Sequence, residues 1–147
     1  MTRPPLVPRD VAPDALDDPF WAGCARKEFL VHRCDVCGRA YWPASCCIHH
    51  GAAAMTWCVA SGGGRVHTYT VFHHPYDPAF KERLPYVIAV VELDEGPFFH
   101  TDVVDCEPDD VYVGLPVEVV YETVDDATVI PHFRPARTTS PEGEPPR

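Results

Sequence analysis

The sequence predicts a mainly β protein in which a short N-terminal helix and a zinc ribbon precede a five-stranded barrel of OB type. Three observations predict it. Cysteine and histidine pairs cluster between positions 34 and 50, β-branched and aromatic residues dominate several runs between 65 and 133, and no helices alternate with those runs. A chain of 147 residues fits one compact unit, or a small metal-held module attached to one barrel.

The first expected element is a short helix over residues 18–28. Asp18 and Pro19 are typical of an N-cap followed by the first helical position. A strand over 29–32 is then expected to lead into a cysteine pair, and a second over 40–42 to leave it. These elements together predict a rubredoxin-like zinc ribbon.

Five later runs have the composition of barrel strands. Gly62 to Gly64 break the chain after residues 55–59, and Gly and Asp residues mark turns further on. The long segment 73–85 is interrupted by prolines and is expected to be a binding loop. The predicted barrel strands are 65–72, 86–93, 98–104, 117–124 and 128–133.

The predicted division of the chain follows from these elements and from the prolines, many of which lie near the two ends. We expect a flexible N-terminus over 1–17, the helix and ribbon over 18–60, the OB barrel over 61–135, and a disordered tail over 136–147.

A metal site is predicted where cysteine and histidine residues repeat at a spacing of three. Cys34 and Cys37, followed by Gly38, have the spacing of a zinc knuckle. The second pair is either Cys46 with His49 or Cys47 with His50.

We favour Cys47 and His50 because Gly51 follows His50 as Gly38 follows Cys37. A set of three cysteines and one histidine without an acidic ligand would be a closed, structural zinc site. Cys24, Cys58 and Cys106 are isolated and are expected to be buried apolar residues.

Charge and hydropathy exclude several classes of function. The net charge of −10 argues against nucleic-acid binding, which needs many Lys and Arg residues. No stretch approaches 18 consecutive apolar residues, and no export signal is visible at the N-terminus. We therefore expect a cytoplasmic protein without a membrane partner. The cysteine count of seven is odd, so the clustered cysteines are expected to serve metal binding rather than disulfides.

Several segments along the chain form one specific pattern when taken together: residues 19–21, 34–38, 42–43, 62–64, 66–71, 85–96, 114–119 and 133–135. This pattern resembles the DUF35 family of zinc-ribbon and OB-fold proteins, which accompany acyl-CoA enzymes. This sequence departs from the usual second Cys-x-x-Cys of that family by offering Cys47 and His50.

The resemblance implies a non-catalytic accessory subunit of a thiolase-superfamily complex, which stabilises its partner and helps to shape the acyl-CoA channel. The implied reaction is thiolysis, acyl transfer or retro-aldol carbon–carbon cleavage, with steroid side-chain degradation as one setting. Because thiolase-like partners are two-fold symmetric dimers, we expect a heterotetramer of two plus two chains, which contacts acyl-CoA through the partner.

Two surfaces are predicted to carry this role. Five aromatic residues lie in a segment that we expect to be too thin to bury them all, and we assign them to partner binding: Phe20, Trp21, Phe29, Tyr41 and Trp42. Four residues of the long loop are assigned to the substrate channel: His73, His74, Tyr76 and Phe80.

Two alternatives remain open. An acyl-CoA enzyme would rest on acid–base groups, for which the candidates are His67, His73, His74, His100 and Asp102. A single-strand nucleic-acid-binding OB protein would use aromatic rings, most of which the strand alternation predicts to be core: Tyr69, Phe72, Tyr86, Phe98 and Phe99. Its basic groups would come from a patch formed by Arg65, Lys81, Arg83 and Arg134.

Overall fold

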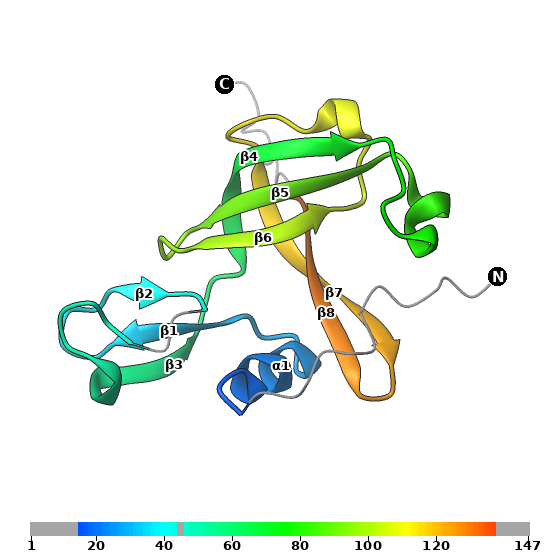
Figure 1. Cartoon of the computed structure of the whole chain (residues 1–147). Coiled ribbons are helices and arrows are strands. Elements are labelled where there is room, and N and C mark those ends of the chain that lie inside the picture. Colours follow the sequence, from blue (N-terminus) through cyan, green and yellow to red (C-terminus); the bar gives the residue numbers. More distant parts are fainter. Residues whose placement is uncertain (1–14, 44–45, 138–147) are drawn as a thin grey trace, which may run out of the picture.

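A small ribbon sheet and a helix lie against one end of a closed five-stranded barrel (Figure 1). This computed structural model describes residues 15–43 and 46–137. The mainly β fold class, with a ribbon ahead of an OB-type barrel, is therefore confirmed. Most of the predicted flexible N-terminus and disordered tail lies outside the described residues. Among the described residues, no helix is long and apolar enough to cross a membrane.

The ribbon is an antiparallel sheet with the strand order β2-β1-β3. Its strands are β1 (Leu30–Cys34), β2 (Ala40–Tyr41) and β3 (Met55–Val59), and the short 3-10 helix η1 (Ala52–Ala54) precedes β3. Strand β2 contributes only two residue pairs to the sheet. A sheet this small has little hydrogen bonding of its own to stabilise it.

Helix α1 (Asp18–Ala25) is shorter than predicted. It ends early because the backbone N–H of Arg26 bonds to the carbonyl of Gly23 and Lys27 has a φ of 61°. The N-cap is Asp17 rather than Asp18, and its side chain makes no capping bond. The chain then turns directly into β1, which brings the apolar face of the helix onto the barrel.

The barrel has the strand order β4-β5-β6-β8-β7 and closes between β7 and β4. Four of its contacts are antiparallel, whereas β6 and β8 are parallel and pair only at Val103 and Phe133. The strands are β4 (Gly63–Phe72), β5 (Tyr86–Leu93), β6 (Phe98–Val103), β7 (Pro116–Asp125) and β8 (Thr128–Pro135). The contact between β6 and β8 is therefore the least extensive strand pairing of the barrel.

The predicted glycine break is partly wrong, because Gly63 and Gly64 belong to β4. Gly64 pairs with Leu93 of β5 and with Val117 of β7, so two strands approach it at once. A Cβ atom at Gly64 would lie 2.5 Å from the carbonyl oxygen of Glu92. The glycine thus permits a close strand contact instead of ending the sheet.

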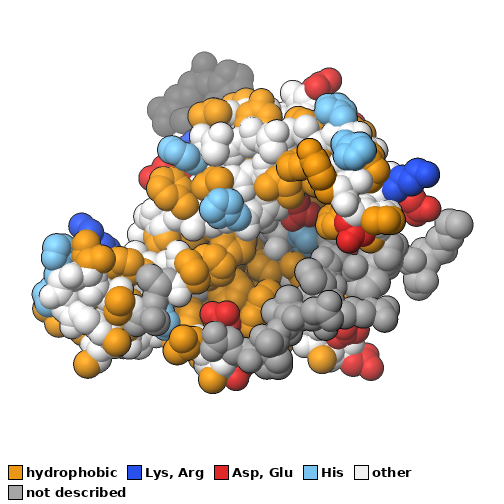
Figure 2. Space-filling view, in the orientation of Figure 1, with side chains coloured by type: hydrophobic (Ala, Val, Ile, Leu, Met, Phe, Trp, Pro, Cys, Tyr) orange, Lys and Arg blue, Asp and Glu red, His pale blue; other side chains and the backbone are white. Residues whose placement is uncertain are grey.

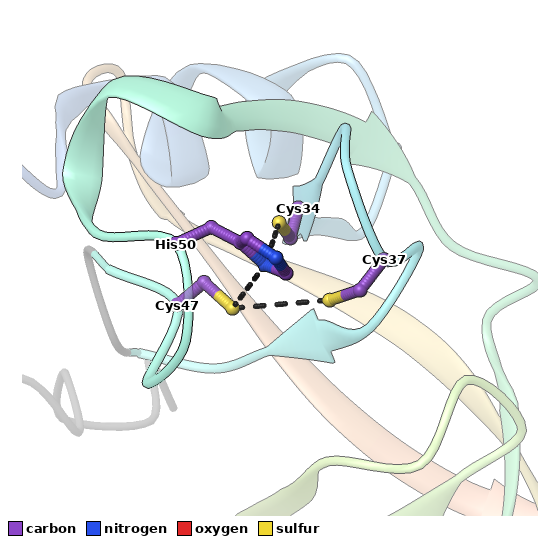
Figure 3. Close-up of side chains that lie close together, drawn as sticks. All are labelled: Cys34, Cys37, Cys47 and His50. Carbon is purple, nitrogen blue, oxygen red and sulfur yellow. Dashed lines mark hydrogen bonds between the residues drawn. The ribbon is translucent and has the colours of Figure 1, made fainter.

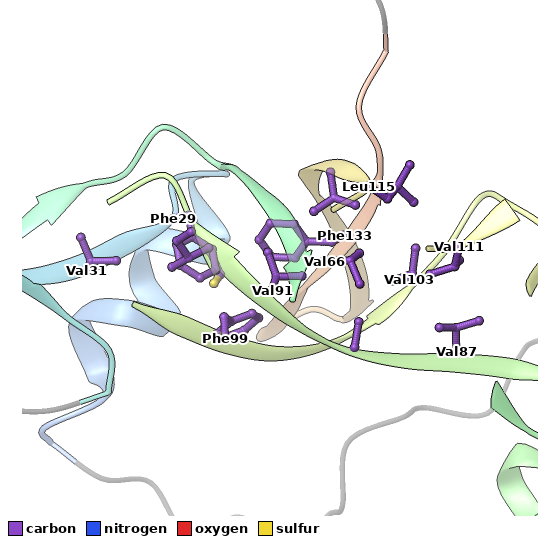
Figure 4. Packing of buried hydrophobic residues seen from close by; sticks show 14 of the residues in the cluster. Phe29, Val31, Val66, Val87, Val91, Phe99, Val103, Val111, Leu115 and Phe133 are labelled. Atoms are coloured by element: carbon purple, nitrogen blue, oxygen red, sulfur yellow. The ribbon is translucent and has the colours of Figure 1, made fainter. Parts of the chain in front are cut away.

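Four phenylalanine rings, those of Phe20, Phe29, Phe99 and Phe133, join the helix, the ribbon and the barrel into one apolar core. Figure 4 labels Phe29, Phe99 and Phe133 in this cluster. The ring of Phe29 lies 5.4 Å from Phe20, 5.0 Å from Phe99 and 6.0 Å from Phe133, measured between centroids. All three contacts are edge-on, an arrangement that aromatic pairs favour. Cys24 of the helix and Val31 of the ribbon belong to the same cluster, and the rest of the core lies in the barrel and is mainly valine.

Candidate functional site

Four side chains from the ribbon converge on one point (Figure 3). Cys34 is the last residue of β1 and Cys37 lies in the turn that follows, whereas Cys47 and His50 lie in the turn before η1. Their ligand atoms are all within 4.8 Å of one another, so that together they could bind a metal ion. The set is the one that the sequence predicted.

The distances fit a tetrahedral ion. The Sγ atoms of Cys37 and Cys47 are 3.8 Å apart, and Nδ1 of His50 lies 3.6 Å from Sγ of Cys34 and 3.5 Å from Sγ of Cys47. A zinc ion bonded at ~2.3 Å to sulfur and ~2.0 Å to nitrogen would separate two sulfurs by about 3.8 Å, and a sulfur from a nitrogen by about 3.5 Å. The residues present therefore fit a zinc ion.

The two turns that carry the ligands are built alike. Gly38 donates its backbone N–H to the carbonyl of Cys34, and Gly51 donates to the carbonyl of Cys47 in the same way. The glycines have φ values of 72° and 73°, in the left-handed region that side chains disfavour. Each half of the site thus ends in the same glycine turn.

Cys47 is surrounded by hydrogen-bond donors. The hydroxyl of Tyr41 and the backbone N–H of His49 each donate to its Sγ at 3.4 Å. The Tyr41 bond, with the contacts from His49 and His50, outweighs burial and lowers the pKa of the Cys47 thiol to about 5. A thiolate is the form that binds a metal, so these neighbours prepare the ligand.

The alternative pair, Cys46 with His49, is not part of the convergent set. Both side chains are exposed, and the ring of His49 lies 6.3 Å from that of His50. Of the isolated cysteines, Cys24 is fully buried as predicted, whereas Cys58 and Cys106 are only partly buried.

A second feature is a cavity of about 430 Å³ between the barrel, helix α1 and the 3-10 helix η2 (Pro78–Arg83). Figure 2 shows a hollow floored by hydrophobic side chains at this place. Its walls include Trp21, Trp42, Phe80, Tyr86, Phe99 and Ile130, and its polar lining includes Arg83, His100, Asp102 and His132. We call it the aromatic cavity.

One polar cluster at this cavity was missed by the sequence analysis. His132 is buried, its Nδ1 forms a hydrogen bond with Oδ1 of Asp102, and its Nε2 lies 3.0 Å from Oε2 of Glu122. Burial opposes protonation, but the Asp102 bond and the charges of both carboxylates raise the pKa of His132. Arg83 completes the cluster, with Nη2 4.0 Å from Oε1 of Glu122.

The predicted partner-binding residues do not share one environment. Trp21 is 43% exposed, and Tyr41 and Trp42 are partly buried. Phe20 and Phe29 are buried, at 3% and 1% exposure, so these two rings are not available at the surface for a partner. Phe99 and Phe133 of the barrel, which are distant in the sequence, pack against these two rings and bury them.

The predicted channel residues are also divided. Phe80 lines the aromatic cavity, whereas His73, His74 and Tyr76 are exposed on the loop outside it. Of the candidate acid–base groups, His100 and Asp102 line the cavity, and His67 packs against the ring of Phe98. The loop thus contributes to the cavity through η2 rather than through its histidines.

The structure leaves the nucleic-acid alternative with accessible rings but with few free basic groups. Of its five rings only Phe99 is buried, so the expectation that most are core is wrong, and Tyr69 and Phe98 are exposed. Three of the four residues of the expected basic patch face other groups of the barrel, whereas Lys81 is exposed. Arg83 faces Glu122, Arg134 donates to Glu118 at 3.0 Å, and Arg65 donates to the carbonyl of Gly114.

Comparison with known proteins identifies the family. The model of the ChsH2 C-terminal OB-fold domain matches residues 57–122. A DUF35 domain-containing scaffold protein of Methanothermobacter thermautotrophicus is 37% identical over 94 residues, which cover 63% of this chain and 70% of that protein. The chain belongs to the DUF35 family.

Two further matches cover a larger share of this chain. The probable enoyl-CoA hydratase alpha subunit of Thermomonospora curvata is 39% identical over 122 residues, which cover 82% of this chain but only 38% of that subunit. A solved structure described as the Ltp2-ChsH2(DUF35) aldolase matches with a TM-score of 0.72 and 33% identity, and the match covers 89% of this chain and 98% of that chain. This DUF35 chain therefore corresponds to a whole chain of the aldolase but spans under two fifths of the hydratase subunit.

Proposed function

We propose that this chain is a non-catalytic accessory subunit of a complex that acts on acyl-CoA thioesters. The observation that carries the proposal is the match over 98% of a DUF35 chain solved as part of an aldolase. The likeness to a probable enoyl-CoA hydratase subunit supports the same substrate class. We infer a thiolase-like partner that holds the catalytic groups and cleaves or forms a carbon–carbon or thioester bond, with steroid side-chain degradation as one setting.

We propose that the ribbon holds one structural zinc ion through Cys34, Cys37, Cys47 and His50. Four protein ligands fill a tetrahedral shell, so no position is left for a reactive water. The ion would stabilise a segment whose own sheet is very small. The role of the ion would be to keep the ribbon in the conformation that binds the partner.

The chemistry of the second cluster also favours a non-catalytic role. Both ring nitrogens of His132 face carboxylates, so this histidine has no free nitrogen to accept a proton from a substrate. We expect no turnover of acyl-CoA thioesters by this chain alone.

The surface proposed for partner docking is the rim formed by Trp21, Tyr41 and Trp42. An exposed tryptophan beside an apolar cavity is the kind of residue that interface centres contain. A two-fold symmetric partner would present the same docking patch twice, which predicts two copies of this chain around one dimer.

Co-purification with the thiolase-like protein encoded beside this chain tests the proposal. We expect the double variant Trp21→Ala, Trp42→Ala to lose the partner, and Tyr112→Ala, which removes an exposed ring elsewhere on the barrel, to keep it. If deletion of 73–77 abolishes the complex while the double variant retains it, the docking surface is wrongly assigned. If the chain remains a lone monomer with that protein, the accessory role fails.

A further inference from the structure

We propose that the aromatic cavity is a binding site for a neutral, ring-bearing molecule whose hydroxyl group donates a hydrogen bond to the carboxylate of Asp102. The inference rests on the proposed function only for the natural source of the ligand, which would be the acyl part of the thioester. Binding itself is a property of this chain and can be measured without a partner.

The apolar part of the site has the size and lining of a small-molecule pocket. Its volume of about 430 Å³ lies within the range of about 300–1,000 Å³ that is usual for ligand sites. Rings from three separate regions face it: Trp21 from α1, Phe80 from η2 and Phe99 from the barrel. Such walls favour a flat apolar body that displaces water from aromatic surfaces.

The polar part of the site contains one carboxylate oxygen that can still accept a hydrogen bond. Oδ1 of Asp102 is engaged by His132, whereas Oδ2 accepts no hydrogen bond from the described residues. The side chain is 21% exposed and lines the cavity. A carboxylate next to apolar walls is stabilised by donors, and a ligand hydroxyl would supply one.

The local charges favour a neutral ligand over an anion. The carboxylates of Asp102 and Glu122 are balanced by Arg83 and by protonated His132. Arg83 is turned toward Glu122, and this contact ties η2, and with it Phe80, to the barrel. Nε and Nη2 of Arg83 are buried without a hydrogen-bond partner among the described residues, but the two cations of the cluster only balance its two carboxylates. The cluster therefore offers no net positive charge to a carboxylate or phosphate, so the nucleotide end of a CoA ester would be bound by the partner.

Three probes with the same ring system separate the contributions. The alcohol 1-(2-naphthyl)ethanol can donate and accept a hydrogen bond, 2-acetonaphthone can only accept, and 2-ethylnaphthalene can do neither. Binding to the zinc-loaded full chain is followed by NMR through the indole N–H signals. Trp21 and Trp42 line the cavity, whereas Trp57 packs on His32 in the ribbon and serves as the internal control.

We expect the alcohol to shift the Trp21 and Trp42 signals and to bind about tenfold more tightly than the ketone or the hydrocarbon. Asp102→Asn keeps an oxygen for His132 but weakens the acceptor, and it should reduce alcohol binding to the level of the hydrocarbon. Asp109→Asn, which neutralises an exposed carboxylate elsewhere, should change nothing. Ile88→Trp fills the cavity and should abolish binding of all three probes, with zinc content and thermal unfolding as checks of folding.

Two results would overturn the inference. Equal affinity for alcohol and hydrocarbon, unchanged in Asp102→Asn, would remove the assigned hydrogen bond. If no probe shifts the Trp21 and Trp42 signals, the cavity is not a ligand site. If Ile88→Trp then also fails to bind the partner, the cavity instead accommodates a side chain of the partner. If no probe binds but the complex with the partner forms, the ligand site is wrong and the accessory role stands. If the alcohol binds but no complex forms, the ligand site stands and the accessory role fails.

Discussion

The ribbon and the barrel of this chain are stabilised in different ways. The barrel closes on itself and buries a row of valines such as Val66, Val91 and Val117, each at 2% exposure or less. The ribbon leaves Val36 and Ile48 at 67% and 70% exposure. A segment that buries so little apolar surface needs another source of folding energy, and a metal ion bound by the four convergent ligands would provide one.

The two regions meet at Phe29, whose ring is in contact with both helix α1 and the barrel. The residues before the metal ligands are therefore part of the common core, whereas the ligand turns lie beyond it. This difference predicts that damage to the metal site stays local, and that damage to the phenylalanine cluster spreads to both regions.

The largest effect is expected on removal of the metal. Cys47→Ser should lower zinc content from about one equivalent to well under half and unfold the turns around the site, since structural zinc contributes on the order of 10 kcal/mol to small zinc modules. The barrel should remain folded. Elemental analysis and backbone NMR of the ribbon and barrel signals measure the two outcomes separately.

Cys46→Ser is the matched control, because it removes the neighbouring thiol that lies outside the convergent set. It should retain zinc and stability. The assignment of Cys47 and His50 is wrong if Cys46→Ser loses the metal, and a barrel that melts together with the ribbon would contradict the separation of the two regions.

The next largest effect is expected at the junction. Phe29→Ala removes a ring that is 1% exposed, and large-to-alanine changes at buried phenylalanines cost about 3–5 kcal/mol. Both regions should lose stability together in chemical denaturation. Phe98→Ala, at a neighbouring but 46% exposed ring, should cost much less, and equal losses in the two variants would contradict a shared core.

The ribbon and the barrel also differ in how far the sequence predicts them. The metal ligands follow a local spacing, and Gly38 and Gly51 mark the ends of two equal turns, so the convergent set could be chosen from the order of residues alone. The strands of the barrel were predicted within a few residues, since β-branched residues and turn residues mark their ends.

Contacts between distant residues could not be predicted in this way. The burial of Phe29 depends on Phe99 and Phe133, about 70 and 100 residues further along the chain. The cluster of Asp102, Glu122 and His132 has no fixed spacing, because it forms only where β6, β7 and β8 lie together. A histidine between Pro131 and Phe133 in an apolar strand was the one local signal of a buried polar group.

A pH-dependent effect is expected in the barrel alone. The groups facing His132 are Asp102 and Glu122, and Arg83 lies next to Glu122. Burial opposes protonation of His132, but the two carboxylates raise its pKa in the folded state. A raised pKa stabilises the fold below the unfolded value of about 6.5, and this stabilisation is lost as the pH rises through the folded value. His132→Gln should therefore cost about 1.5–3 kcal/mol near pH 6 and less near pH 9.

Urea unfolding of the barrel at several pH values measures this difference. His100→Gln, at an exposed histidine on the same strand as Asp102, should show no such dependence. A stability gap between wild type and His132→Gln that grows from pH 6 to pH 9 would contradict the protonated, doubly paired state of His132. Zinc content should be unaffected, because the cluster lies in the barrel.

The smallest effect is expected from the glycine turns, and it tests whether the two halves of the metal site are equivalent. A Cβ atom at Gly38 or Gly51 meets nothing within 4 Å, so only the positive φ opposes a side chain. Gly38→Ala and Gly51→Ala should each cost on the order of 1 kcal/mol. Gly51→Asn should give no relief, because the ψ of −168° at Gly51 lies outside the left-handed helical conformation that asparagine adopts. Competition with a zinc chelator measures the loss as weaker metal binding. A much larger loss at one glycine would mean that the two turns carry unequal parts of the site, and no loss at either would mean that the ribbon relaxes around its ligands.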